Sequence, residues 1–309
     1  MGNTGDKSVG YEKSLLNLCN SNDNLLVLTA ENRALIRNTE SALGERFIDT
    51  GINEQTIVGF SAGLALQGYK PIVHALAAFL TMRAFEFVRT DVGLPNLPVK
   101  LMAFIPGILS DGNGQTHQAI EDISLIRGIP NFEIYTPSCE QDLVLCLPHI
   151  INNDNPCYVR LNHLPGVTEH QPYTEQTELE VLIEGAETLV ISYGIISQNA
   201  FIAVNEFNDS ENQKIGLLSV RKIWPLNVEL FLSIIDHYSK VIIIEDHFSI
   251  GGLRSIIAEL NLSENLRKDF HFINFGDTPF KAGNLQAVAK NSKMDSESIK
   301  KKLLKLKGL

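Results

Sequence analysis

Short apolar runs alternate with helical segments along this chain of 309 residues, and that alternation is the strongest constraint on its fold. In the first half, the predicted strands lie at 25–29, 47–49, 71–75, 99–105, 132–136 and 158–161. The helices predicted between them lie at 56–66, 81–92, 119–127 and 141–152. Strands and helices that alternate at such spacings form a parallel sheet with helices covering both faces.

A segment poor in apolar residues, 162–180, interrupts the alternation and contains Pro165, Gly166 and Pro172. Residues of these types favour loops. The alternation then restarts, with strands at 188–193, 215–220, 241–245 and 271–275 and helices at 197–207 and 228–237. We therefore predict a first α/β domain at 1–163, a linker at 164–183 and a smaller α/β domain at 184–309.

The composition indicates a soluble globular protein, with 44% hydrophobic and 20% charged residues. A net charge of -10 argues against nucleic acid or an anionic membrane as a partner. No apolar run approaches the ~20 residues that a membrane helix needs, and the first ten residues lack the apolar core of a signal peptide. The four cysteines are scattered without metal-ligand spacing, which is typical of reduced thiols. We expect a cytoplasmic protein with no metal ligands of its own.

Glu54 opens a helix rich in small residues, among them Gly59, Ser61, Ala62 and Gly63. Such a helix can approach its neighbours closely, so the carboxylate at its start is expected to be partly buried. Burial raises a carboxyl pKa, and a group of that kind can hold or share a proton near neutral pH. The ordinary alternative is a carboxylate that only faces the positive end of the helix dipole.

Several motifs occur in order around Glu54. Through them the chain resembles the transketolase family, in particular the C-terminal portion of enzymes that are split into two polypeptides. The resemblance covers most of the chain and is strongest at 47–161. The motifs are Arg46-Phe-Ile-Asp-Thr-Gly-Ile-Asn-Glu-Gln55, Ala78-Phe79, Arg83-Ala-Phe-Glu86, Thr116-His117-Gln118, Ile129-Pro-Asn131, Tyr158-Val-Arg160, Glu245-Asp-His247 and Gly251-Gly252.

The resemblance implies thiamine diphosphate as the cofactor and assigns its neighbours. Glu54 falls on the catalytic glutamate that activates the aminopyrimidine ring, and Phe79 falls on the aromatic residue that stacks on this ring. Stacking adds ~0.5–1.5 kcal/mol beyond burial. Arg83 follows in the same cofactor segment, and Glu31 stands where the family usually has an aspartate close to the thiazolium. Without the resemblance, Phe79 would be an ordinary core residue.

The substrate residues implied by the resemblance are His117, Arg160, Asn113 and Ile105. His117 falls on a histidine that faces the substrate and could donate to an alkoxide or carry its proton. Arg160 falls on an arginine that helps to hold a substrate phosphate. Asn113 replaces an aspartate that reads a substrate hydroxyl, and Ile105 replaces a phosphate-binding histidine. These replacements predict an altered substrate. The ordinary alternatives are a solvated loop histidine and an arginine paired with a surface acid.

The family binds the diphosphate through Mg²⁺ with a Gly-Asp-Gly motif followed by an asparagine, and the sequence contains no such segment. The resemblance therefore implies that an N-terminal partner subunit supplies the Mg²⁺ and diphosphate ligands. We expect an α2β2 heterotetramer in which this chain is active only with its partner.

The predicted function is transfer of a two-carbon ketol unit to an aldehyde-like acceptor, with a non-standard sugar as substrate. Three alternatives stay open: the β subunit of a 2-oxo acid dehydrogenase, a deoxyxylulose-type synthase and a non-catalytic assembly subunit. Thr116-His117-Gln118 favours transketolase over the dehydrogenase, and the synthase would normally be a longer single chain. Retention of Glu54, Phe79 and His117 argues against the non-catalytic subunit.

Overall fold

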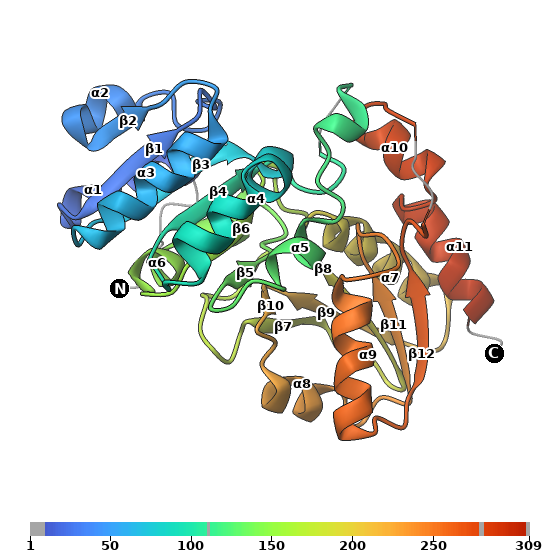
Figure 1. Cartoon of the computed structure of the whole chain (residues 1–309). Coiled ribbons are helices and arrows are strands. Elements are labelled where there is room, and N and C mark those ends of the chain that lie inside the picture. The colour runs from blue at the N-terminus through green and yellow to red at the C-terminus, as the bar shows by residue number, and fades with distance from the viewer. Residues whose placement is uncertain (1–9, 110–111, 278–280, 307–309) are drawn as a thin grey trace, which may run out of the picture.

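The computed structural model describes residues 10–109, 112–277 and 281–306, which form two β-sheets flanked by helices (Figure 1). The first sheet has the strand order β10-β5-β6-β4-β3-β1-β2. All of its pairings are parallel except the one made by β10. The strands are β1 (Leu25–Thr29), β2 (Phe47–Asp49), β3 (Lys70–Leu76), β4 (Lys100–Phe104), β5 (Glu133–Tyr135), β6 (Cys157–Leu161) and β10 (Lys222–Trp224). The predicted parallel sheet is confirmed.

Helices cover both faces of this sheet, and strand periodicity explains why. Alternate residues of a strand point to opposite faces. Leu26 and Leu28 of β1 belong to the apolar cluster that includes α3 (Glu54–Leu66). Leu25 and Val27 belong to the cluster formed with α1 (Tyr11–Ser21) and α6 (Glu140–Asn152). All five residues of β1 are buried, as its continuous apolar sequence requires.

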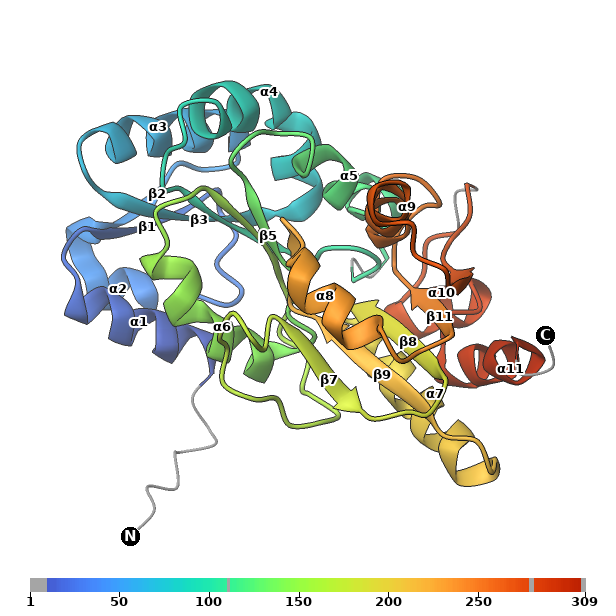
Figure 2. The same cartoon turned by 90° about the horizontal axis from the view of Figure 1, so that it is seen from below.

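The second sheet has the order β12-β11-β8-β9-β7 and carries helices on both faces (Figure 2). Its strands are β7 (Leu179–Ile183), β8 (Thr188–Tyr193), β9 (Ile215–Val220), β11 (Lys240–Ile244) and β12 (Asp269–Ile273). Only β7 pairs antiparallel. The flanking helices are α7 (Ile196–Ser210), α8 (Val228–Ile235), α9 (Leu253–Glu264), α10 (Leu285–Asn291) and α11 (Ser296–Leu306). The smaller second α/β domain is thus present.

The linker predicted at 164–183 is wrong at its carboxyl end. Strand β7 lies inside it and forms the edge of the second sheet by pairing with β9. Its residues Leu179 and Glu180 are buried, so the exposed part of the linker ends before them. Strand β10 lies after the predicted linker in the sequence but pairs with β5 of the first sheet. One strand of the second domain therefore belongs to the sheet of the first domain.

The single helix predicted at 81–92 is also wrong. The segment forms a π-helical turn, η2 (Phe79–Arg83), a short α4 (Phe85–Phe87) and a second π-helical turn, η3 (Val88–Gly93). Helices α1 and α10 and the short α2 (Thr39–Leu43) were not predicted. The remaining elements are α5 (Asp122–Ile126) and the 3-10 turns η1 (Gly44–Arg46) and η4 (Gly114–Thr116). Among the described helices, none has the length and apolar character of a membrane span.

Candidate active site

Glu54 is the first residue of α3, and its carboxylate is buried with 2% of the residue exposed. Asn53 caps the helix, its Oδ1 accepting from the backbone N–H of Thr56 at 3.2 Å. The Glu54 Oε2 accepts a hydrogen bond from Nη1 of Arg83 at 2.8 Å. The expected burial is therefore observed, and the buried carboxylate is paired with a cation.

Arg83 continues the contact to the predicted aromatic platform. Its guanidinium carbon lies 4.0 Å from the centroid of the Phe79 ring. The Phe79 ring meets the imidazole of His117 edge to face, with 5.1 Å between ring centroids and 64° between planes. The Nδ1 of His117 lies 2.9 Å from the hydroxyl of Thr116. The fold thus brings Glu54, Arg83, Phe79 and His117 into one continuous group.

Ile105 and Glu31 lie where β4 and β1 end, at the carboxyl edge of the first sheet, and both have left-handed backbones, with φ of 51° and 61°. A β-branched residue rarely adopts this conformation, and such strain costs ~1–3 kcal/mol. The Ile105 side chain packs against an apolar cluster that contains Ile108 and Ile195. Glu31 is exposed, and its backbone N–H donates to Asp49. Neither side chain has a contact with Glu54 among the described interactions.

Asn113 is exposed on the loop before η4, and the second domain supports this loop. The N–H of Gly112 donates to the carbonyl of Gly283 at 3.4 Å. A Cβ placed on Gly114 would lie 2.9 Å from the Cβ of Ala282, so the two segments are in close contact. The position of Asn113 and His117 therefore depends on the segment that precedes α10 (Figure 1).

Arg160 is buried in ion pairs rather than exposed to a substrate. Its Nε lies 2.9 Å from Asp122 Oδ2, and its Nη1 lies 2.6 Å from Asp246 Oδ1 in the second domain. Burial alone would lower the Arg160 pKa, but the two carboxylates hold it well above its usual range. Substrate contact would require these pairs to break, so the structure favours the ion-pair alternative, with buried acids in place of a surface one.

The Glu245-Asp-His247 motif lies at the junction between the two domains. Glu245 accepts from the N–H of Leu253 at 2.7 Å, and burial raises its pKa to about 7. A Cβ on Gly252 would lie 2.4 Å from the Glu245 carboxylate, and one on Gly251 would lie 2.1 Å from Ser124 of the first domain. These glycines are needed because side chains would collide at the junction.

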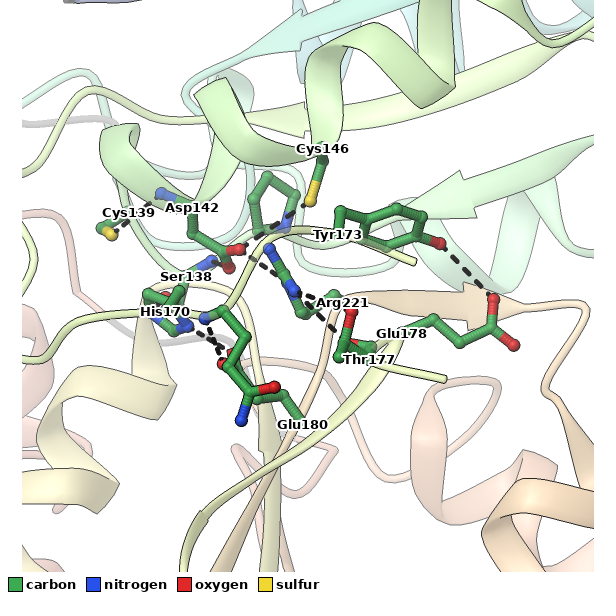
Figure 3. Close-up of polar contacts among 12 residues, drawn as sticks. Ser138, Cys139, Asp142, Cys146, His170, Tyr173, Thr177, Glu178, Glu180 and Arg221 are labelled. Atoms are coloured by element: carbon green, nitrogen blue, oxygen red, sulfur yellow. Dashed lines mark hydrogen bonds and ion pairs between the residues drawn. The ribbon is translucent and has the colours of Figure 1, made fainter. Parts of the chain in front are cut away.

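A second polar cluster lies beside the predicted linker (Figure 3). His170 contacts the Ser138 hydroxyl through Nε2 at 2.8 Å and the Glu180 carboxylate through Nδ1 at 2.6 Å. The order matches a hydrolytic triad. Burial lowers the His170 pKa, but hydrogen bonds to Cys139 and Glu180 outweigh it and raise the pKa to about 10. A protonated imidazole cannot act as a base, and the adjoining cavity of about 10 Å³ admits no more than one water. This cluster is structural.

Sequence reasoning did not single out Asn53, Asp49 or His170. An asparagine directly before the first helical residue is a capping signal and could have identified Asn53. The Asp49 carboxylate accepts hydrogen bonds from the Arg33 guanidinium and from the Glu31 N–H, and both contacts depend on the fold. Among the described residues, no group of three or more His, Cys, Asp and Glu side chains could hold a metal ion.

The fold and this group of residues define the pyrimidine-binding and C-terminal part of a transketolase. Residues 10–164 match the family described as "Transketolase, pyrimidine binding domain", and residues 177–299 match "Transketolase, C-terminal domain". The chain belongs to the transketolase family, whose members depend on thiamine diphosphate.

Relatives of similar length include proteins described as a transketolase subunit or C-terminal section. The chain is 32% identical to the 6-deoxy-6-sulfo-D-fructose transketolase subunit SqwH of Clostridium sp. (strain MSTE9), over 82% of this chain and 80% of the relative. It is 29% identical to a putative transketolase C-terminal section of Methanocaldococcus jannaschii, over 96% and 94%. A solved structure described as a split gene transketolase, inactive beta4 tetramer, matches with a TM-score of 0.83 and 27% identity over 96% of each chain. The chain spans only 40% of a related 1-deoxy-D-xylulose-5-phosphate synthase from Synechococcus sp. (strain WH7803).

Proposed function

We propose that this chain is the C-terminal subunit of a thiamine-diphosphate-dependent enzyme that transfers a two-carbon ketol unit to an aldehyde-like acceptor. The observation that carries the proposal is the contiguous group formed by Glu54 at the start of α3, Phe79 of η2 and His117, with Arg83 joining the first two. A buried carboxylate beside a half-buried aromatic ring suits a heteroaromatic ring that must be stacked and hydrogen-bonded at once.

The residues of this chain have separate roles at the aminopyrimidine end of the cofactor. Glu54 would hold a proton at a ring nitrogen, Phe79 would stack on the ring face, and His117 would donate to oxygen on the reacting substrate. Glu31, at the edge of the sheet, is assigned to the thiazolium side. Bound thiamine diphosphate would supply the carbanion chemistry. His117 contacts Phe79, so a substrate oxygen bound to the imidazole would lie near the cofactor.

The remaining half of the site belongs to a partner in this proposal. An N-terminal subunit would contribute the diphosphate and Mg²⁺ ligands and assemble with this chain as an α2β2 heterotetramer. The relatives described as a transketolase subunit and a C-terminal section support a split enzyme. The four cysteines are free and buried, which favours a reducing compartment such as the cytoplasm.

The substrate is proposed to differ from an ordinary pentose phosphate. Ile105 presents an apolar side chain where a phosphate donor was expected, and Arg160 is paired with Asp122 and Asp246. Asn113 is exposed and can donate as well as accept a hydrogen bond. An unphosphorylated or otherwise modified sugar fits this set better. The name of the SqwH relative refers to a sulfonated sugar for that protein.

The test is reconstitution with the N-terminal subunit and measurement of hydrogen–deuterium exchange at the thiazolium C2 carbon. Glu54→Gln keeps side-chain size but removes the titrating group, so we expect exchange to slow by at least ~100-fold, within the range of acid–base catalysis. The matched control is Glu86→Gln, an exposed residue of α4 that should leave exchange unchanged.

Two outcomes would contradict the proposal. Wild-type exchange rates in Glu54→Gln would remove Glu54 from its role. Tight, Mg²⁺-dependent binding of thiamine diphosphate by this chain alone would contradict the split site. Ketol-transfer products distinguish this function from the synthase alternative, which would decarboxylate its donor.

A further inference from the structure

The buried carboxylate of Glu54 has one hydrogen-bond partner among the described residues, the guanidinium of Arg83. Only 3% of the Glu54 side chain is exposed, whereas 46% of the Arg83 side chain is exposed. A buried charge that loses its partner is strongly destabilising, because protein groups no longer replace its lost hydration. The cation that pairs with the buried Glu54 carboxylate is therefore a side chain that is itself about half exposed to solvent.

The guanidinium of Arg83 has a second contact that fixes its orientation. It stacks on the Phe79 ring at 4.0 Å while Nη1 reaches Glu54 at 2.8 Å. Both residues belong to the π-helical turn η2, whose wider spacing differs from that of an α-helix. A planar guanidinium can stack on a ring and donate from its edge together, which a lysine ammonium cannot do. One side chain thus links the carboxylate to the aromatic platform.

We propose that Arg83 is a positioning residue that holds Glu54 and Phe79 in their working geometry before cofactor and partner arrive. Arg83 compensates the charge of Glu54 in the chain alone and keeps the Phe79 ring against its guanidinium. The pyrimidine half of the site is then preformed, and assembly does not have to order it. The effect of Arg83 on cofactor activation rests on the proposed function. Its pairing with Glu54 in the isolated chain does not.

The first experiment uses the chain alone. Urea unfolding midpoints are measured for wild type, Glu54→Gln, Arg83→Gln and the double variant. We expect Arg83→Gln to lower the midpoint clearly and the double variant to recover part of that loss, because no unpaired carboxylate remains. Additive effects of the two substitutions would overturn the proposal. Arg89→Gln, an exposed arginine of η3, is the matched control and should leave the midpoint unchanged.

The second experiment uses the complex reconstituted with the N-terminal subunit. Arg83→Gln should slow thiazolium C2 exchange at least tenfold while the cofactor concentration at half-saturation changes less, and Arg83→Lys should give an intermediate rate. Equal rates in wild type and Arg83→Gln would overturn the positioning role. If the wild-type complex itself shows no exchange at C2, the proposed function fails. The urea unfolding midpoints of the single and double variants would still show whether Glu54 and Arg83 are coupled in the chain alone.

Discussion

At the scale of single residues, Ile105 combines a strained backbone with the role in substrate choice that we propose for it. A β-branched side chain with a φ of 51° is unusual, and its apolar contacts on one side leave no donor for an anion. Asn113 is neutral where a hydroxyl-reading carboxylate was expected. Both replacements are inferred from the family resemblance, but only the structure shows that Ile105 packs against the apolar cluster.

We predict that the pair Asn113→Asp and Ile105→His shifts the preference of the reconstituted enzyme toward phosphorylated sugars. A hydrogen bond to a charged group contributes ~1.5–3 kcal/mol, so kcat/KM for a pentose phosphate should rise roughly 10- to 100-fold relative to an unphosphorylated analogue. The two single variants serve as controls and should each give a smaller shift. A wild-type enzyme that already works best on pentose phosphates would contradict the prediction.

The fold brings together Glu54, Phe79 and His117, which the sequence analysis had grouped, but the surroundings of Arg160 were not foreseen. The first three were grouped through the family resemblance, which short local motifs carry. The guanidinium of Arg160 is paired with Asp246, a residue 86 positions away in the other domain. Ion pairs of that kind depend on how domains pack, and a single sequence gives no periodic signal for them.

At the scale of elements, the π-helical turns and β7 are structures that the hydrophobic periodicity of the sequence did not predict. The segment after Ala78 has helical composition, yet its first turn widens so that Phe79 and Arg83 stack on each other. Strand β7 follows a proline-containing polar stretch, and pairing with β9 determines its conformation more than local propensity does. Long-range pairing overrode the local pattern at β7, whereas the predicted helix departs from the prediction through a local change of helical spacing.

We predict that the pair of His170 with Glu180 of β7 stabilises the fold in a pH-dependent way. His170→Gln leaves the buried Glu180 carboxylate without a cation, so the free energy of unfolding should fall by ~3–5 kcal/mol at neutral pH. Because the folded pKa is raised to about 10, the stabilisation is fully present below the unfolded value near 6.5 and disappears as the pH rises through about 10.

Urea unfolding of wild type and His170→Gln between pH 6 and pH 10 measures the difference at each pH. The gap should narrow as the pH increases. His163→Gln, an exposed histidine near the end of β6, is the control and should show no gap. A gap that stays constant over this range would show that His170 contributes through packing alone.

At the scale of the whole molecule, the two domains form one continuous core. A single apolar cluster contains Ile134 and Tyr158 of the first sheet together with Ile191 and Leu218 of the second. The buried pairs of Arg160 and the strand pairing of β10 with β5 cross the same boundary. A polar segment in the sequence predicted two domains joined by a linker, and the structure packs these two domains against each other through a shared apolar cluster.

In the proposed assembly, we expect the exposed face of α3 and the loop before it to contact the partner subunit. Ile52 and Leu66 are 71% and 69% exposed, Phe60 is 44% exposed, and Gly63 between them leaves room for a neighbouring helix. Exposed apolar residues grouped on one helix mark an interaction site. This face follows directly from Glu54, so a subunit bound there would lie beside the carboxylate to which we assign cofactor activation.

We predict that Leu66→Asp weakens assembly with the N-terminal subunit by at least ~10-fold in Kd, because a charge would be buried at an apolar interface. The unfolding midpoint of the chain alone should not change, since this side chain is already exposed. Leu262→Asp on α9 is the matched control, because Leu262 is 88% exposed in the other domain. Light scattering of mixed subunits and fluorescence titration measure the two affinities. Equal loss in both variants would mean that net charge, rather than the α3 face, governs the assembly.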